Sequence, residues 1–213
     1  MKVFLIGANG QIGQRLTGLF QQDGTHTLRA MVRKEEQKEA LQAAGTEAVL
    51  ADLEGSAEDI AKAAEGCDAM VFTAGSGGST GYDKTLLIDL DGAAKAIEAA
   101  KKAGIKRFIM VSALQAHNRA NWNESLKPYY AAKHYADKIL EASGLTYTII
   151  RPGGLLNDPG TGNINAADLA RGSISRDDVA KTVIESLNEP NTFEKAFDLT
   201  AGSTPIREAL KQL

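Results

Sequence analysis

Short runs of β-branched and other apolar residues alternate along the chain with longer segments in which apolar positions recur every three or four residues. The short runs predict seven strands: Lys2–Ile6, Thr27–Val32, Ala48–Ala51, Ala69–Thr73, Arg107–Val111, Thr146–Ile150 and Phe197–Leu199. The longer segments predict six helices: Gln11–Asp23, Glu35–Ala44, Ala57–Ala64, Lys84–Lys102, Tyr129–Ser143 and Arg176–Asn188. Because consecutive strands are separated by enough residues for a crossover helix, the pattern predicts a parallel sheet covered on both faces.

Glycine residues mark where the predicted helices end. Five of them follow a helical segment at the place where a left-handed residue closes the last turn, namely Gly24, Gly45, Gly66, Gly104 and Gly144. Three stretches without a regular period are predicted as loops: Gly75–Gly81, Ala113–Lys127 and Gly153–Ala170. The chain of 213 residues therefore predicts one α/β domain over residues 1–213, with a doubly wound parallel sheet of about seven strands. A short substrate-side segment is expected from about residue 153 onward.

The predicted helix Lys84–Lys102 carries one apolar stripe at steps of three and four residues. This stripe predicts packing on the sheet, and a subunit interface is the alternative. A monomer and a homodimer both remain open.

Composition excludes several classes of protein. The formal net charge of -3, from 24 basic and 27 acidic residues, argues against a nucleic-acid partner. The single cysteine, Cys67, excludes an intrachain disulfide and a cysteine zinc cluster, and three histidines leave little for a metal site, so no metal is expected. Without a long apolar run or a signal-peptide pattern, we expect a cytoplasmic protein that does not associate with a membrane.

The first strand runs directly into a glycine-rich turn that precedes a helix. The residues are Gly7, Ala8, Asn9, Gly10, Gln11, Ile12 and Gly13, with the spacing G-x-x-G-x-x-G. A strand, a tight turn and a helix start are what a diphosphate site requires, because the first amides of the helix are unpaired and its dipole end is positive. We therefore predict a dinucleotide site that includes Gly7, Asn9, Gly10, Gln11, Ile12 and Gly13; a tight turn without a ligand is the alternative.

The end of the second strand indicates which dinucleotide is preferred. NAD sites usually place a carboxylate there for the ribose 2′-hydroxyl, whereas a 2′-phosphate needs a cation. Here the strand ends in Arg33 and Lys34, so NADP is favoured and NAD remains possible. The alternative is an exposed pair at a helix start. After the third strand, Asp52 is expected to accept a hydrogen bond from the adenine amine beside Leu53, or else to cap the next helix.

A serine, a tyrosine and a lysine form the candidate catalytic group. Ser112 follows the fifth strand, at the carboxyl edge where ligands bind in open α/β sheets. Tyr129 and Lys133 lie one helical turn apart on the same face, so the ammonium is expected to lower the pKa of the phenol and let it exchange a proton with a substrate oxygen held by Ser112. Tyr130 would point roughly 100° further round the helix. Alternatively, Lys133 binds only the nicotinamide ribose while Tyr129 packs under the loop.

The loop after Ser112 is the candidate substrate wall. It carries His117, the only tryptophan, Trp122, and several asparagines. A solvated connector is the alternative. His134, next to Lys133, is expected at the surface.

These motifs together resemble the short-chain dehydrogenase/reductase superfamily. The resemblance rests on Gly7–Gly13, Ala74-Gly75, Val111-Ser112, Tyr129-x-x-x-Lys133 and Arg151-Pro152-Gly153, and it is closest to the atypical branch similar to epimerase/dehydratases and flavin-reductase-like proteins. It implies a Rossmann-type sheet in which the glycine turn holds the diphosphate, Arg33 meets the 2′-phosphate and Asp52-Leu53 flank adenine. It also implies that Ala74-Gly75 line the adenine ribose, Lys133 bonds the nicotinamide ribose, and Arg151, Pro152 and Gly153 close over the nicotinamide.

We therefore expect an NADP(H)-binding oxidoreductase that acts on a small carbonyl, alcohol or conjugated substrate. One alternative is epimerase or dehydratase chemistry without net redox change. Another is a non-catalytic NADP(H) sensor that binds a partner. The short stretch after Pro152 disfavours a nucleotide-sugar, because sugar epimerases of this superfamily carry a larger substrate region there.

Overall fold

The computed structural model of the chain describes residues 1–78, 80–167, 169 and 171–213. Its strands are β1 (Lys2–Ile6), β2 (Thr27–Val32), β3 (Glu47–Leu50), β4 (Ala69–Phe72), β5 (Arg107–Val111), β6 (Thr146–Pro152), β7 (Gly154–Leu156), β8 (Asn163–Ala167), β9 (Ser173–Ser175), β10 (Lys195–Ala201) and β11 (Thr204–Pro205). Its α-helices are α1 (Gln11–Asp23), α2 (Glu35–Ala43), α3 (Ala57–Ala63), α4 (Tyr82–Lys84), α5 (Ala93–Lys102), α6 (Lys127–Glu141), α7 (Arg176–Ser186) and α8 (Ile206–Lys211). A π-helix, η1, spans Thr85–Gly92, and 3-10 turns lie at Arg119–Asn121, Glu124–Leu126 and Pro190–Thr192.

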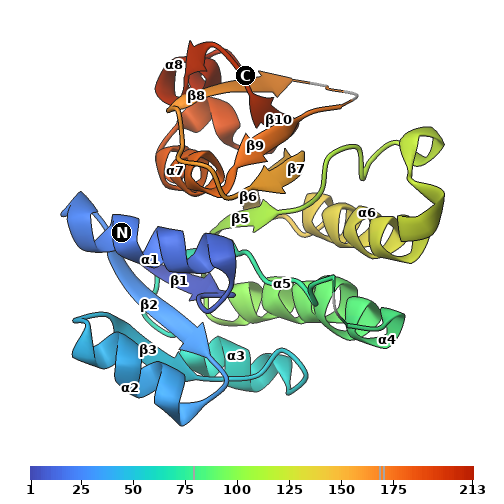
Figure 1. Cartoon of the computed structure of the whole chain (residues 1–213). Coiled ribbons are helices and arrows are strands. Elements are labelled where there is room, and N and C mark those ends of the chain that lie inside the picture. The colour runs from blue at the N-terminus through green and yellow to red at the C-terminus, as the bar shows by residue number, and fades with distance from the viewer. Residues whose placement is uncertain (79, 168, 170) are drawn as a thin grey trace.

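The central sheet is mostly parallel, as the crossover spacing predicts. Its strand order is β11-β8-β10-β6-β5-β4-β1-β2-β3, and the seven predicted strands form its parallel part. Two further strands, β8 and β11, extend one edge in the antiparallel sense, so the sheet has nine strands instead of about seven. Figure 1 shows this twisted sheet with helices on both sides.

Three of the four strands missed by the pattern, β7, β8 and β11, bury few residues, whereas β9 buries Ile174 and Ser175. β7, with three exposed residues, pairs only with β9 in a separate two-stranded sheet, and β8 buries only Ile164. Both fall within the predicted loop Gly153–Ala170, which is therefore partly strand. Ser79, Asp168 and Ala170, which belong to two of the predicted loops, lie outside the described residues.

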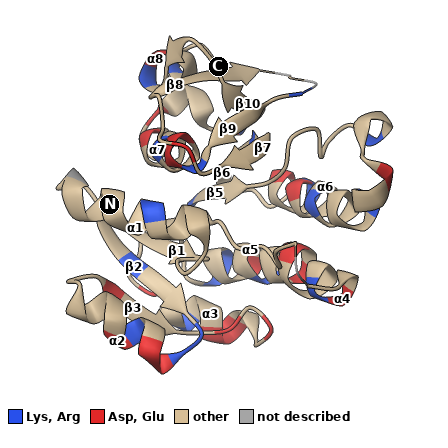
Figure 2. Cartoon of the chain, viewed as in Figure 1, with Lys and Arg blue, Asp and Glu red and all other residues tan. Residues whose placement is uncertain are grey.

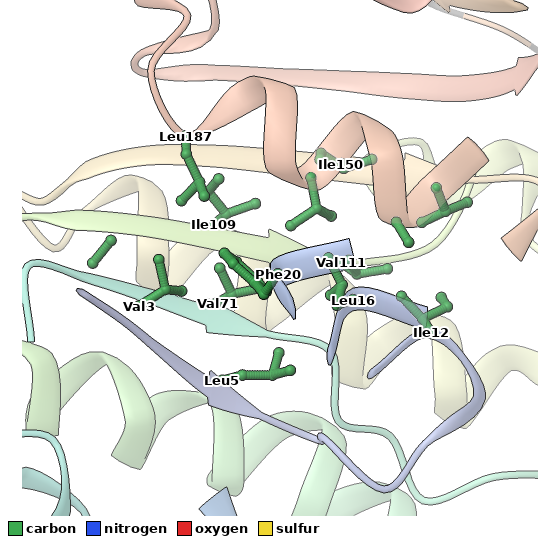
Figure 3. Packing of buried hydrophobic residues seen from close by; sticks show 14 of the residues in the cluster. Val3, Leu5, Ile12, Leu16, Phe20, Val71, Ile109, Val111, Ile150 and Leu187 are labelled. Carbon is green, nitrogen blue, oxygen red and sulfur yellow. The ribbon is translucent and has the colours of Figure 1, made fainter. Parts of the chain in front are cut away.

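Each face of the sheet has its own hydrophobic core. On one face, residues of α1 and α7 pack on alternate positions of β1, β4, β5 and β6; Figure 3 shows Val3, Leu5, Ile12, Leu16 and Leu187 in this cluster. On the other face, α3, α5 and α6 cover the remaining positions of the same strands. Successive side chains of each buried strand therefore point alternately into the two cores, one on each face of the sheet.

The predicted helix ends are confirmed, but one predicted helix is not regular. The five glycines expected to close helices all have positive φ, between 65° and 79°. The segment predicted as one helix over Lys84–Lys102 consists instead of α4, the π-helix η1 and α5. Within the described residues, no helix is both long and apolar enough to cross a membrane.

Candidate cofactor-binding and active site

The glycine turn folds back on itself between β1 and α1. Gly7 has φ of 96°, and the Gly10 amide donates to the Gly7 carbonyl oxygen at 2.9 Å. Gly13 packs so closely that an added Cβ would clash with the Gly7 carbonyl oxygen and lie 2.7 Å from Ala8 Cα. The absence of side chains at Gly7 and Gly13 therefore lets α1 begin directly against the end of β1.

The N-terminus of α1 is open to an anion. No described side chain caps it, and its first turn contains no acidic residue. Gln11 and Asn9 are exposed beside it, whereas Ile12 is buried in the core below. Unpaired amides at the positive end of a helix bind phosphate, so this arrangement fits a diphosphate.

The cations expected at the far end of the dinucleotide site directly follow the neighbouring strand, β2. β1 and β2 pair in parallel with Ile6 opposite Met31, which places Arg33 and Lys34 at the same sheet edge as the glycine turn. Both side chains are exposed, and their backbone amides donate to Gln37 Oε1 at 3.3 Å. Their long side chains are therefore accessible to a 2′-phosphate.

Of the two residues expected to flank the adenine, Asp52 lies at the surface and Leu53 lies in the core. Asp52 is exposed and accepts the amide of Glu54 at 3.0 Å, while the cap of α3 is Ser56. The alternative interpretation of Asp52 as a helix cap is therefore wrong. Leu53 is buried against Gly92 of η1.

After β4, the chain passes between the glycine turn and η1. Ala74 is half-buried, and its amide lies where a Cβ on Gly7 would clash. Gly75 is exposed, and a Cβ added there would lie 3.1 Å from Asp89 Oδ1. The structure thus brings the loops after β1, β2, β3 and β4 to one edge of the sheet.

The three candidate catalytic residues lie at that same edge, supplied by β5 and α6. The amide of Ser112 donates to the Ile150 carbonyl at 2.7 Å, which fixes the end of β5 against β6. Lys133 Nζ lies 5.8 Å from the centre of the Tyr129 ring, as their spacing on α6 requires. Lys133 is 3% exposed and Ser112 is 4% exposed, so both are held within the protein.

The electrostatics around Tyr129 differ from the expectation. Burial raises the pKa of the Tyr129 phenol, and the Lys133 ammonium only partly opposes it because Asp89 acts in the other direction. Burial also disfavours the Lys133 ammonium, but Tyr129 and Asp89 outweigh it, so the pKa of Lys133 lies above its ordinary value. Lys133 therefore lowers the pKa of Tyr129 as predicted, but burial outweighs it, so the pKa lies above its ordinary value and the phenol is protonated at neutral pH.

The side chain of Arg151 is paired with carboxylates of α6. Its side chain is 5% exposed and runs toward α6, where Nε donates to Asp137 Oδ2 at 2.8 Å and Nη2 lies 3.6 Å from Glu141. Pro152 and Gly153 hold the end of β6 through backbone bonds, the Pro152 carbonyl to Leu114 and the Gly153 amide to Leu199. The guanidinium of Arg151 therefore binds carboxylates of α6, and the expected closure of the Arg151-Pro152-Gly153 turn over the nicotinamide stays a prediction.

Two buried carboxylates near Lys133 were missed by sequence reasoning. Asp137 lies one turn after Lys133, and burial raises the pKa of its carboxyl although Arg151, Ser112 and Lys133 oppose this. The Ser112 hydroxyl lies near enough to favour the ionised form of Asp137, but the two groups are not aligned as a hydrogen bond. Asp89 is the second. The one feature of the sequence that could have indicated Asp89 is that this acid lies inside the apolar run from Leu86 to Leu90.

Among the described residues, buried side-chain oxygens that lack an aligned hydrogen-bond partner lie near Lys133. Ser112 Oγ and Asp137 Oδ1 are buried without an aligned hydrogen-bond partner, whereas Asp89 Oδ1 faces the Lys133 ammonium at 3.1 Å. Buried polar atoms are rarely left unpaired, and those that are often mark a ligand or a functional group. Hydroxyls of a ribose or a substrate are the chemistry that such atoms would bind, so the residues present fit a nicotinamide nucleotide.

The loop after β5 packs on α6. Trp122 stacks on Tyr130 with ring centres 6.0 Å apart and donates through Nε1 to the Ala116 carbonyl. His134 is buried and places Nδ1 2.9 Å from the same carbonyl, so the expectation of a surface histidine is wrong. His117 is half-buried in this loop. The aromatic packing and the shared carbonyl fix the loop against α6, and its role as a substrate wall stays a prediction.

Comparison with known proteins agrees with this geometry. The profile of a family described as NAD(P)H-binding matches residues 7–190. The uncharacterized sugar epimerase YhfK of Bacillus subtilis is 80% identical, with all of both chains covered. A Bacillus halodurans structure described as an NAD-dependent epimerase/dehydratase has a TM-score of 0.93 at 42% identity, covering 100% of each chain. The oxidoreductase ylbE of Lactococcus lactis has a TM-score of 0.92 at 36% identity, covering 100% of this chain and 96% of that one.

The family match begins at Gly7, the first residue of the turn between β1 and α1, and extends through both halves of the sheet. The likeness to solved structures covers the whole chain, including the strands that the pattern missed. The glycine turn, the mostly parallel Rossmann-type sheet and the family match agree: the chain belongs to the NAD(P)H-binding family, related to the atypical short-chain dehydrogenase/reductases.

Proposed function

We propose that the protein is an NADP(H)-dependent oxidoreductase acting on a small carbonyl, alcohol or conjugated compound. The observation that carries this proposal is the convergence, at one sheet edge, of the open N-terminus of α1 with Ser112, Tyr129 and Lys133. When bound, the nicotinamide supplies the hydride acceptor or donor. The oxidoreductase ylbE, which resembles this chain over its whole length, supports the same class of chemistry.

The N-terminal half supplies the binding groups. The first amides of α1 would hold the diphosphate, with Gly10 allowing close approach. Arg33 would pair with a 2′-phosphate through its planar guanidinium, and Lys34 would add charge. Asp52 and Leu53 would flank the adenine, and Ala74 and Gly75 would line its ribose.

The C-terminal half supplies the proton chemistry. Ser112 would hold the reacting oxygen of the substrate, and Lys133 would bond a ribose hydroxyl. Because burial keeps the pKa of Tyr129 above its ordinary value, its O–H would donate to an oxygen that gains negative charge during the reaction. A protonated donor suits reduction of a carbonyl or of a conjugated system.

Epimerase or dehydratase chemistry is the second candidate, and the names of two relatives favour it. In that reaction the same site would take a hydride from the substrate and return it. The two functions are separated by product analysis: an oxidoreductase consumes reduced cofactor in proportion to product, whereas an epimerase leaves the cofactor balance unchanged. A panel of small carbonyls and quinones with NADPH is the first assay to run.

Cofactor binding has a built-in probe. Trp122 is the only tryptophan, and its emission overlaps the near-ultraviolet absorption of reduced nicotinamide. We expect NADPH to quench Trp122 emission and to gain emission of its own, with NADH acting only at higher concentration. Trp122→Phe should abolish the transfer while calorimetry still reports binding. No uptake of either coenzyme at millimolar concentration would remove the proposed function.

A further inference from the structure

Asp89 is a buried carboxylate that the proposed function does not use. It is 1% exposed and lies in η1, inside the otherwise apolar run Leu86-Leu87-Ile88-Asp89-Leu90. Transfer of an ionised carboxylate into the protein interior is costly unless it is paired, so its position requires a partner. π-helical turns are rare and are frequent at functional sites.

The partner is the lysine of the candidate site. Asp89 Oδ1 lies 3.1 Å from Lys133 Nζ, with 0% and 4% of the two side chains exposed. The other oxygen, Oδ2, accepts the backbone amide of Ser76 at 3.0 Å. Asp89 therefore ties α6 to the loop after β4, the loop expected to line the cofactor.

The surrounding backbone is shaped to admit this pair. Gly75 lies against the carboxylate, where a Cβ would come within 3.1 Å of Oδ1. In η1 the buried residues are Thr85, Ile88, Asp89 and Gly92, so the wide turn presents Asp89 to the interior while Leu86 and Leu87 remain exposed. The carboxylate is thus a fixed part of the site, held on three sides by α6, the Ser76 amide and its own helix.

Resting on the proposed function, we propose that Asp89 is a positioning residue that holds and neutralises the Lys133 ammonium, so that Tyr129 faces an ion pair instead of a free cation. A free ammonium beside a phenol would favour the phenolate, whereas an ion pair has little net charge to do so. Tyr129 then stays protonated through neutral pH and serves as a proton donor. The substrate class that follows is a carbonyl or another acceptor whose oxygen must gain a proton as it gains a hydride.

The charges around the pair give the sign of the expected change. The groups that act on Tyr129 are Lys133, Asp89, Tyr130 and Asp137, and those that act on Lys133 are Tyr129, Asp89 and Asp137. Asp137 is itself paired with Arg151 at 2.8 Å. Removing the Asp89 charge therefore leaves Lys133 as the dominant net charge beside Tyr129, and the first proton lost by the Tyr129–Lys133 pair should be lost at lower pH, whichever group releases it.

The test is an ultraviolet titration of tyrosinate in the full-length protein. Asp89→Asn keeps the shape of the side chain and an oxygen for the Ser76 amide. Subtracting the titration of the matched Tyr129→Phe variant isolates Tyr129 from the other four tyrosines. We expect the Tyr129 transition to fall by about one pH unit or more in Asp89→Asn, and to rise again in Asp89→Asn/Lys133→Met, where neither charge remains. Coincident Tyr129 transitions in wild type and Asp89→Asn would overturn the proposal.

Thermal unfolding provides the second measurement. If Asp89→Asn is destabilised because it leaves an ammonium buried alone, then Asp89→Asn/Lys133→Met should unfold at a higher temperature than Asp89→Asn. A double variant no more stable than the single one would mean that Asp89 acts on something other than Lys133, and would overturn the proposal even if the single variant is too unstable to titrate. NADPH binding to the wild-type protein, followed through Trp122 emission, tests the proposed function independently of the ion pair. Shifted titration without NADPH uptake would retain the ion pair and discard the proposed function.

Discussion

The two ends of the candidate site use different kinds of chemical group. At the end proposed for the diphosphate, the binding groups are backbone amides. The helix α1 starts uncapped, and the lack of side chains at Gly7 and Gly13 lets α1 approach the end of β1 closely. At the end proposed for the nicotinamide, buried charged side chains from η1, α6 and β6 form two ion pairs, Lys133 with Asp89 and Arg151 with Asp137.

Figure 2 places most charged residues on the helices, with few on the strands. These two ion pairs belong to the smaller group of buried charged residues, which also includes Arg107, Asp178 and Asp198. The fold at the backbone end should tolerate changes of exposed side chains better than atoms added at Gly7 or Gly13. The side-chain end should tolerate changes of shape better than the loss of one charge. The following substitutions test this contrast, from the largest expected effect to the smallest.

The largest effect is expected from breaking the second buried pair with Arg151→Met. The substitution fills a similar volume but leaves Asp137 buried without its guanidinium, which should reduce the free energy of unfolding by about 3–5 kcal/mol. The matched control is Arg207→Met, which removes an ion pair of the same length, 2.8 Å, from an arginine that is 77% exposed. Denaturant unfolding should show at most about 1 kcal/mol there. Equal losses in the two variants would contradict the contrast.

The same variant has a pH signature. The pKa of Asp137 is raised in the folded protein, so its contribution to stability is fully present below the unfolded pKa of about 4 and is lost as pH rises through the folded pKa. Without Arg151 that pKa rises further, and the loss extends toward neutrality. The difference in stability between wild type and Arg151→Met should therefore widen from acid to neutral pH. A difference that narrows would have the wrong sign.

At the diphosphate end, the strongest test is Gly13→Ala. One added methyl group must displace the Gly7 carbonyl and Ala8, because these are backbone atoms that cannot rotate away. We expect a loss of about 1–3 kcal/mol in unfolding free energy, together with a large loss of NADPH affinity. Gly18→Ala, in the same helix with open space around it, should instead stabilise by about 0.5–1 kcal/mol. Similar behaviour of both variants would show that α1 does not need to approach the turn.

The same contrast explains what the sequence could predict. The seven parallel strands, most of the helices and the glycine turn follow from local period and local backbone rules, so their positions were predicted to within a few residues. The places of Arg33 and Ser112 just after β2 and β5 followed from the same strands. The direction of the Arg151 side chain did not follow, because its partner Asp137 is on another element. Position along the chain places a residue at an edge of the sheet, but it does not say which way a long side chain turns.

Asp89 shows the limit most clearly. Its helix was predicted from an apolar stripe, and an acid within such a stripe gives no indication of a π-helical turn or of a lysine more than forty positions away. His134 was placed on the surface for the same reason, because its partner, the Ala116 carbonyl, belongs to a loop without periodicity. Buried polar contacts are fixed by tertiary packing, and one sequence carries no direct record of them.

The next effect concerns selectivity at the exposed end. Arg33→Asp should weaken NADPH binding at least tenfold, about 1.4 kcal/mol, because it removes a charge-assisted bond and adds repulsion, while NADH binding changes little. Energy transfer from Trp122 measures both affinities. The control Lys62→Asp makes the same change of charge on an exposed residue at the end of α3 and should leave the ratio unaltered. An unchanged NADPH to NADH ratio in Arg33→Asp would remove the assignment of this residue.

The smallest expected effect comes from a substitution that tests whether backbone amides of α1 bind the diphosphate. Gln11→Glu adds one negative charge at the exposed first position of α1, where the amides are uncapped. The charge should stabilise the free protein by about 0.3–1 kcal/mol through the helix dipole, yet weaken NADPH binding severalfold by repelling the diphosphate, and added salt should reduce both changes. Gln22→Glu, in the last turn, should slightly destabilise the protein without affecting NADPH. General damage to the fold cannot raise the stability of Gln11→Glu while lowering its NADPH affinity. A Gln11→Glu variant that loses both stability and affinity, or that binds NADPH as wild type does, would therefore mean that the diphosphate binds elsewhere.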